Sequence, residues 1–300
     1  MNLLKNCHLC PRNCNINRYK EKGFCQANAK IKVALAKPFF YEEPPISGTN
    51  GSGAIFFSGC NLRCCFCQNS QISKKNIGQE ITIKRLAEIM LELQEQKVHN
   101  INLVTPTMYI PQIAKAIKKA KKMGLTIPII YNSSAFEYPD AIKVLDGLID
   151  VYLPDMKYYS DQYAIKYSNA PNYFNIAKES IKEMHRQVGS CMFDQNGLIT
   201  KGVIVRHLML PSLIEDTKII LKYLYNEYHD DIFISIMNQY TPMGNVPKEL
   251  KYPIKETNYN KIINYALDLG IQNAFCQIGE TAKESFIPNF NLDGIKKLKK

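Results

Sequence analysis

The chain has 300 residues, of which 46% are hydrophobic, enough for one large α/β domain plus a small module. Its formal net charge is +11, but most of the excess is lysine spread along helix faces, which favours solvated surfaces over a nucleic-acid interface. No apolar run reaches the roughly eighteen residues that span a membrane, and residues 1–12 lack the apolar stretch of an export signal. We therefore expect a cytoplasmic protein whose clustered cysteines bind metal instead of forming disulfides.

Residues 1–30 are predicted to form a cysteine-rich metal module. Cys7, Cys10, Cys14 and Cys25 leave gaps of two, three and ten residues, in a segment too short to bury a core of its own. A bound metal would hold such a segment together. Zinc and a second iron–sulfur cluster both suit four thiolates, and the spacing does not decide between them.

Residues 31–50 are interpreted as a connector. Residues 31–35 fit a short strand, residues 42–45 (Glu-Glu-Pro-Pro) are expected to break regular structure, and the glycines of 47–53 suggest a flexible lead-in. This divides the chain into a module with its connector, 1–50, and a core domain, 51–300.

From residue 54 onward, buried strands alternate with amphipathic helices. Strands are expected at 54–58, 100–104, 127–131, 149–153, 203–208 and 232–236, with a last one near 273–277. Helices are expected at 82–96, between Pro111 and Gly124, and at 139–145, 161–167, 174–188, 215–228 and 257–269. Six βα units of this kind predict a parallel, incomplete barrel of the (β/α)6 type.

The loop after the first of these strands carries the strongest motif. Cys60, Cys64 and Cys67 are separated by three and then two residues. This spacing allows a short loop to wrap around a [4Fe–4S] cluster. Such a cluster normally takes four thiolates, so three would leave one iron open to a small molecule. A zinc loop is disfavoured because zinc sites usually show two separated ligand pairs. Cys65 is expected to be a small buried residue, although a register in which it is a ligand stays open.

Polar residues follow the other strands where each one ends. They are Thr105, Asn132, Asp155 and Lys157, then Arg206 with His207, and finally residues 238–240. In barrel enzymes the site lies at the carboxyl ends of the strands, so these side chains are expected to meet at one mouth.

The cysteine motif, with the aromatic Phe66 before its last cysteine, resembles the signature of the radical S-adenosylmethionine (radical SAM) superfamily. The flanking residues 56–59 (Phe-Phe-Ser-Gly) and 68–69 (Gln-Asn) are similar to those of proteins related to the pyruvate formate-lyase activating enzyme. The resemblance covers about residues 51–280. It implies a partial (β/α)6 barrel, and an open iron that chelates SAM and cleaves it reductively to a 5′-deoxyadenosyl radical.

The resemblance also implies SAM-binding residues at the strand ends. Phe66 would cover the ligand, and Thr105 falls where a glycine-rich turn, missing here, usually meets the amino group of SAM. Asn132 offers a donor and an acceptor to the sugar. Asp155 and Lys157 resemble an acid-x-lysine pair of the activating enzymes, and they suit a ribose hydroxyl or ammonium and a carboxylate, respectively. The alternative for these two residues is an ion pair on the loop surface. No catalytic side chain is assigned.

Two classes of function compete. The first is a radical SAM oxidoreductase that abstracts hydrogen from a substrate, which in the activating enzymes is a glycyl residue of a partner protein. Its electron donor is expected to be an acidic flavodoxin or ferredoxin. The four-cysteine N-terminal module departs from the activating enzymes, which puts that substrate in question. The second class is a non-catalytic, metal-stabilised basic module for electron transfer or nucleic-acid binding, which leaves the polar strand ends unexplained.

Overall fold

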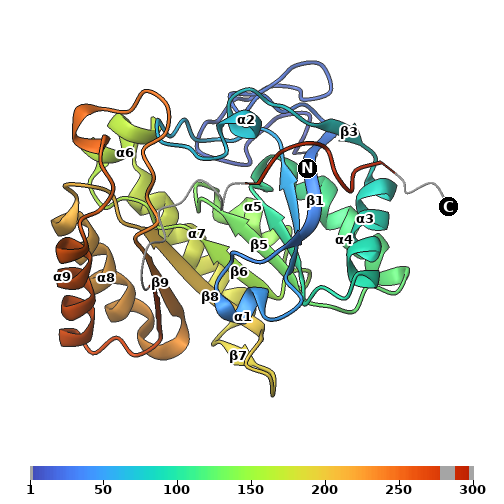
Figure 1. The fold of residues 1–300 in the computed structure, drawn as a ribbon. Coiled ribbons are helices and arrows are strands. Elements are labelled where there is room, and N and C mark those ends of the chain that lie inside the picture. The colour runs from blue at the N-terminus through green and yellow to red at the C-terminus, as the bar shows by residue number, and fades with distance from the viewer. Residues whose placement is uncertain (1–2, 278–287, 297–300) are drawn as a thin grey trace.

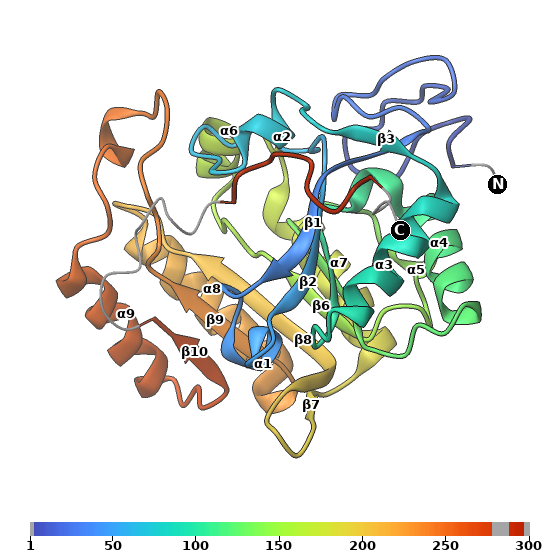
Figure 2. The same ribbon diagram turned by 45° about the vertical axis from the view of Figure 1, so that its right-hand side comes forward.

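The computed structural model describes residues 3–277 and 288–296. At its centre is a sheet with the strand order β10-β9-β8-β6-β5-β4-β2-β1-β3. The strands from β10 to β2 in this order run parallel to their neighbours. Helices lie along the outside of the sheet (Figures 1 and 2). The chain therefore forms the partial barrel that the alternating pattern predicts.

Every predicted core strand is present. The strands are β2 (Ser52–Phe57), β4 (Ile101–Val104), β5 (Ile129–Ser133), β6 (Val151–Pro154), β8 (Ile199–Leu208), β9 (Phe233–Met237) and β10 (Ala274–Cys276). All residues of β2, β4, β5 and β6 are buried. Helices cover one face of the parallel sheet, and the other face lines the barrel interior. Both faces are therefore buried, and the sequences of these strands are almost continuously apolar.

The predicted helices are also present. They are α3 (Ile83–Glu95), α4 (Ile110–Lys122), α5 (Pro139–Lys143), α6 (Asp161–Ser168), α7 (Tyr173–Val188), α8 (Ile214–Tyr228) and α9 (Glu256–Asp268). Thr82 caps α3, since its hydroxyl accepts a hydrogen bond from the Arg85 amide at 3.0 Å. Shorter helical turns occur at α2 (Ser70–Ser73), η1 (Thr107–Tyr109), η2 (His229–Asp231) and η3 (Lys248–Leu250).

Antiparallel strands extend the sheet beyond the predicted set. β1 (Ile31–Phe39) pairs with β2, and β3 (Gln79–Ile81) pairs with β1. β7 (Met192–Phe193) forms a hairpin with β8. The short strand expected at 31–35 is thus longer, because β1 is bonded on both sides near its start.

One expectation for the connector is wrong. Residues 42–45 were expected to break regular structure, yet a one-turn helix, α1 (Pro44–Ser47), begins inside this segment. Proline is compatible with the first turn of a helix, where no backbone N–H is needed. As a result the chain turns inward after β1, and Glu42 and Glu43 are carried into the molecule, where Glu43 is buried.

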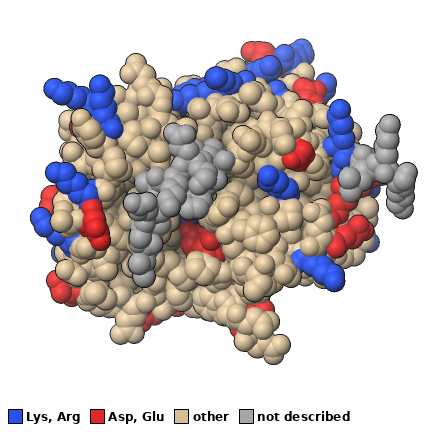
Figure 3. Space-filling view, viewed as in Figure 1, with Lys and Arg blue, Asp and Glu red and all other residues tan. Residues whose placement is uncertain are grey.

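Charge on the exterior is dispersed. Lysine and arginine side chains are scattered over the face of the molecule shown in Figure 3, with acidic side chains among them. In the described part of the chain, no helix combines the length and the apolar character that a membrane crossing requires.

Candidate functional site

The ends of three neighbouring strands bring the candidate site together. Asn132 lies near the end of β5, Asp155 follows β6, and Arg206 lies on β8, where it forms an isolated bridge with Asp155. Their side chains line a cavity of about 230 Å³. The same cavity is lined by Glu42 and Lys157 and, from the predicted cluster loop, by Cys64, Phe66 and Cys67. The strand ends therefore converge with the loop, as barrel geometry leads one to expect.

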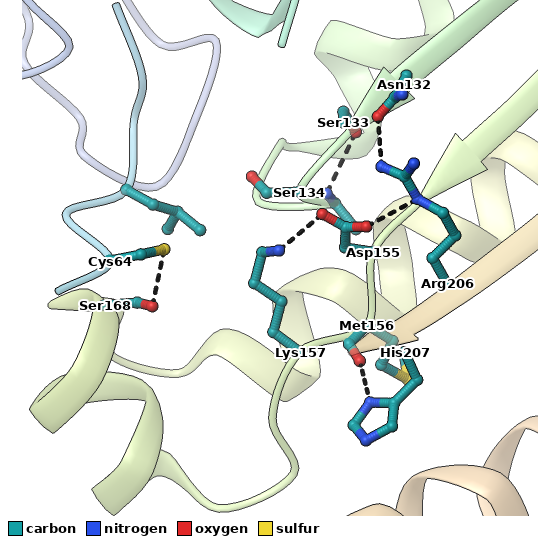
Figure 4. A network of polar contacts seen from close by, with 12 residues as sticks. Cys64, Asn132, Ser133, Ser134, Asp155, Met156, Lys157, Ser168, Arg206 and His207 are labelled. Carbon is teal, nitrogen blue, oxygen red and sulfur yellow. Dashed lines mark hydrogen bonds and ion pairs between the residues drawn. The ribbon is translucent and has the colours of Figure 1, made fainter. Parts of the chain in front are cut away.

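Asp155 contacts two cations inside this cavity (Figure 4). Lys157 Nζ lies 2.6 Å from one carboxylate oxygen, and Arg206 Nε lies 3.0 Å from the other. Arg206 also donates a hydrogen bond to the side-chain carbonyl of Asn132 at 2.6 Å. The side chains of Asp155 and Lys157 are each 17% exposed. The two residues do form an ion pair, but they form it in the cavity and not on the open surface.

The electrostatics keep both members of this pair charged. Burial acts to raise the pKa of Asp155, but Lys157 and Arg206 outweigh it and hold the pKa below its usual value. Burial likewise acts to lower the pKa of Lys157, whereas Asp155 and then Cys64 raise it. A charged lysine and a charged carboxylate therefore stand beside the cysteine loop.

Glu42 is a member of the site that the sequence analysis missed. Its carboxylate is 3.1 Å from a guanidinium nitrogen of Arg206 and accepts a hydrogen bond from the Asn102 side chain at 2.9 Å. Burial raises the pKa of Glu42 to about 7, against the opposing charge of Arg206. Its partners lie on strands far away in the chain. The only local signal in the sequence was the pair of adjacent acids, Glu42 and Glu43, in the segment after β1 (Ile31–Phe39).

Two of the three motif cysteines, Cys64 and Cys67, line the cavity, and Cys60 is close enough to interact with both. The thiol of Cys64 accepts a hydrogen bond from Ser168 at 3.0 Å, and the thiol of Cys67 is 3.2 Å from the hydroxyl of Ser73. Burial raises the pKa of Cys60, and its neighbours Cys64 and Cys67 raise it further. Among the described residues, no three His, Cys, Asp or Glu side chains are gathered closely enough to hold a metal ion as they stand.

The backbone of the loop is fixed from α6. The amides of Arg63 and Cys65 donate to the carbonyls of Ser168 and Tyr167 at 3.0 and 2.8 Å. Phe66 is buried, and its ring centroid is 5.8 Å from that of Tyr240, with both residues lining the cavity. Phe66 therefore forms part of the wall beside the cysteines.

Two other residues of interest lie apart from the cavity. Neither Cys65 nor Thr105 is among the described residues that line it. Thr105 has φ +57°, an uncommon conformation for a β-branched residue, and its amide donates to the Asn132 carbonyl at 2.9 Å. The structure therefore places Thr105 beside the strand end that carries Asn132, and its role toward SAM stays a prediction.

The four N-terminal cysteines also lie near one another. A side chain added at Gly23 would meet the sulfur atoms of Cys14 and Cys25 at 3.4 and 3.6 Å. Burial raises the pKa of Cys10 to about 12, and Cys25 and Cys7 contribute to that shift. Gly23 therefore leaves space beside the sulfur atoms of Cys14 and Cys25.

The N-terminal module is packed directly against the cluster loop. Arg12 donates to the Asn61 carbonyl at 2.8 Å, and Arg63 donates to the carbonyl of Phe24. The guanidinium groups of Arg12 and Arg63 lie 3.9 and 4.4 Å from the ring centroid of Phe24. A side chain at Gly59 would come within 2.5 Å of the Cys25 carbonyl, so only glycine fits this contact.

Comparison with known proteins assigns the family of this site. Residues 54–194, which include the cysteine loop and the Asp155–Lys157 pair, match the model of the radical SAM superfamily. The chain carries a radical SAM domain. The family implies a [4Fe–4S] cluster and SAM, and the donor set fits them: soft thiols on one loop border a cavity with polar, charged strand ends.

Two curated relatives of this chain come from Methanocaldococcus jannaschii. One uncharacterized protein is 29% identical over 286 residues, covering 89% of this chain and 77% of its own length. A second uncharacterized protein is 26% identical over 178 residues, 52% of this chain and 50% of its own. Neither name specifies a reaction.

Two solved structures are similar to this chain at low sequence identity. Methylornithine synthase (PylB) has a TM-score of 0.50 at 14% identity, with 72% of this chain and 60% of that chain covered. A domain of a pyruvate-formate lyase-activating enzyme from Bacteroides vulgatus has a TM-score of 0.42 at 11% identity, with 58% and 94% covered. The likeness to PylB shows the fold alone.

Proposed function

We propose that this protein cleaves SAM reductively at a [4Fe–4S] cluster held by Cys60, Cys64 and Cys67. The bound cluster and SAM would supply a 5′-deoxyadenosyl radical that abstracts hydrogen from a substrate. One observation carries the proposal: thiols of the motif line the same cavity as the charged residues of the strand ends. An arrangement that only transferred electrons would not need that cavity.

The residues of this chain would have distinct roles. Lys157, whose ammonium faces both Asp155 and Cys64, suits the carboxylate of SAM, and Asp155 suits its ammonium or a ribose hydroxyl. Arg206 holds Asp155 and Asn132 in place. Phe66 and Tyr240 shield one side of the cavity from water. These contacts orient the ligand without a further catalytic side chain.

The narrower proposal is hydrogen abstraction from a glycyl residue of a partner enzyme. It is supported by the Asp155-x-Lys157 pair, which resembles the activating enzymes. The N-terminal module is the feature that departs from that pattern, and we propose that its four cysteines hold a second metal centre, of zinc or of iron and sulfur. The proposal is supported by the Cys14 and Cys25 sulfur atoms beside Gly23 and by the electrostatic contact of Cys10 with Cys25 and Cys7.

The test of the main proposal is anaerobic reconstitution with iron and sulfide, followed by reduction in the presence of SAM. We expect 5′-deoxyadenosine from the wild type, and none from Cys60→Ala, Cys64→Ala or Cys67→Ala. Cys65→Ala is the matched control and should retain most of the activity, since Cys65 lies outside the three-then-two spacing of the motif.

Two results would contradict this assignment. Activity in Cys64→Ala together with inactivity in Cys65→Ala would show that the register of the ligands is wrong. A reconstituted wild type that holds its cluster, is reduced, and leaves SAM intact would favour the electron-transfer hypothesis instead.

A further inference from the structure

Residues 288–296 form a strap that crosses β1 and reaches α3 (Figures 1 and 2). The strap begins at the cavity beside the cysteine loop, where Pro288 is one of the lining residues. It also carries Phe290, whose residue exposure is 9%. The strap contains no helix or strand of its own, so its position depends on the contacts that it makes with the rest of the chain.

Strand β1 holds the middle of the strap. The pairing of β1 with β2 skips Ala34 at a shift in register. The Ala34 carbonyl accepts a hydrogen bond from the Leu292 amide at 3.1 Å, and the Ala36 amide donates to the Asp293 carbonyl at 2.9 Å. Gly294 has φ +72°, and a Cβ atom added there would collide with the Ala36 carbonyl. The backbone of the strap is thus fixed closely to β1.

Arg85 anchors the far end of the strap to α3. Its guanidinium donates hydrogen bonds to the carbonyls of Ile295 at 2.8 Å, Lys296 at 3.1 Å and Gly294 at 3.3 Å. The carboxylate of Glu92 accepts two hydrogen bonds from Arg85, at 2.5 and 2.8 Å, and raises its pKa. Arg85 therefore stays charged, and charge-assisted hydrogen bonds hold a segment that lies 210 positions away in the chain.

Phe290 supports an aromatic part of the cavity wall. Its ring centroid is 5.5 Å from that of Phe56, which lies 5.9 Å from that of Phe39. Phe56 and Phe39 line the cavity, and Phe290 belongs to the apolar cluster that packs around them. Phe290 therefore acts on the cavity through Phe56, while Pro288 extends the same wall.

Covering the edge of β1 is the simpler explanation for the strap. β3 pairs with β1 only at residues 31–33, and the strap bonds to the part of β1 that follows them. Proteins commonly protect an exposed strand edge in this way. Edge protection does not explain, however, why the strap begins at the cavity or why its buried aromatic side chain supports Phe56.

We propose that Phe290 and Arg85 are positioning residues for SAM, and that the strap they hold is a wall of the SAM cavity. This inference rests on the proposed radical SAM function. A fixed wall keeps water away from the charged contacts of Asp155 and Lys157, and such contacts are stronger where the dielectric constant is low. Loss of the wall should therefore weaken SAM binding, although neither Phe290 nor Arg85 is among the described lining residues.

The first test is the SAM affinity of the reconstituted holoenzyme, measured by calorimetry together with the thermal stability of each variant. Phe290→Ala and Arg85→Met should each weaken SAM binding several-fold. Phe193→Ala and Lys84→Met are the matched controls, because Phe193 lies on the β7 hairpin and Lys84 is the exposed neighbour of Arg85 on α3. Both controls should keep the affinity of the wild type.

Hydrogen exchange in the wild-type holoenzyme gives a second reading that needs no variant. The Leu292 amide, bonded to Ala34, exchanges when the strap opens, and SAM bound against the closed wall disfavours that opening. We therefore expect SAM to slow exchange in residues 288–296 and to leave the β7 hairpin unchanged. An affinity within about twofold of the wild type in both strap variants, or exchange in the strap that SAM does not slow, would overturn the proposal.

SAM cleavage by the wild type is measured separately. If the wild type binds SAM more tightly than Phe290→Ala does but leaves it intact, the result counts against the radical SAM function and supports the wall. If the wild type cleaves SAM while both strap variants bind it as tightly, the proposed function stands and the strap only covers the edge of β1.

Discussion

Asp155 is the residue that links the charges of the cavity, and its variants test the ligand-binding role. Exposed ion pairs contribute only about 0–1 kcal/mol, whereas a buried charge-assisted contact to a ligand contributes about 1.5–3 kcal/mol. We therefore expect Asp155→Asn and Lys157→Met to weaken SAM affinity roughly ten- to a hundredfold and to reduce 5′-deoxyadenosine formation. The measurement is SAM binding, after the iron content of each variant has been checked.

The chain offers a matched control on its surface. Asp140 and Lys143 form an ion pair at 2.8 Å whose side chains are 90% and 56% exposed. Asp140→Asn and Lys143→Met should leave SAM affinity unchanged. If Asp155→Asn and Lys157→Met carry a full cluster and behave like these controls, neither cavity residue serves SAM.

We expect the buried carboxyl group of Glu137 to make the free energy of unfolding depend on pH. It is fully buried and accepts hydrogen bonds from Thr107 at 2.5 Å and Ser133 at 3.3 Å. Burial raises its pKa from 4.5 to about 7. The folded state thus keeps a proton that the unfolded state releases, and the free energy of unfolding falls as pH rises from about 4.5 to 7. The loss is on the order of 3 kcal/mol.

Glu137→Gln should remove this part of the pH dependence, because the amide does not titrate. Urea unfolding at pH 5, 6, 7 and 8 would show a shallower decline than in the wild type. Burial also raises the pKa of Glu42 to about 7. The free energy of unfolding of the variant should therefore still fall somewhat with rising pH. Parallel curves for wild type and variant would show that Glu137 does not hold a proton in the folded state.

At the scale of elements, local patterns predicted most of the barrel. The strands and helices after residue 54 have strong periodicity and recognisable ends, such as Thr82 before α3 and Gly270, with φ +88°, after α9. Short elements were missed because their structure depends on the strand they pair with and not on their own sequence. For example, β3 has only three residues, and it is a strand because it pairs with β1. The contact of Glu42 with Arg206 joins residues 164 positions apart, and no local pattern reports it.

The N-terminal module is the element whose metal is still a proposal. The sulfur atoms of Cys14 and Cys25 lie beside Gly23, and the module is attached to the cluster loop through Arg12, Phe24 and Arg63. We expect Cys10→Ser and Cys14→Ser each to lower the metal content by one centre while the barrel cluster is retained. Metal analysis with the iron–sulfur absorption spectrum would separate zinc from a second cluster. Cys191→Ser, directly before β7, is the control. Metal content equal to the wild type in all three variants would rule out the centre.

The charge of the whole molecule bears on its electron donor, which we propose is an acidic protein of the flavodoxin or ferredoxin type. The net charge of +11 is dispersed, so a local feature must direct docking. Lys74 and Lys75 supply one: both are exposed directly after α2, and the charge of Lys74 acts on Cys65 within the cluster loop. A negatively charged donor would be drawn to the loop at this point.

Turnover with a flavodoxin should therefore fall several-fold as salt screens this attraction, over a Debye length of about 10 Å at 0.1 M. Turnover with titanium(III) citrate, a small reductant that needs no docking surface, should change little. Lys74→Glu with Lys75→Glu should slow the flavodoxin reaction at low salt and flatten its salt dependence. Lys118→Glu with Lys119→Glu changes the net charge equally on the exposed face of α4 and is the matched control. If both double variants slow the flavodoxin reaction alike, the net charge and not the lysines beside the loop attracts the donor. If neither does, the donor is not recruited by charge.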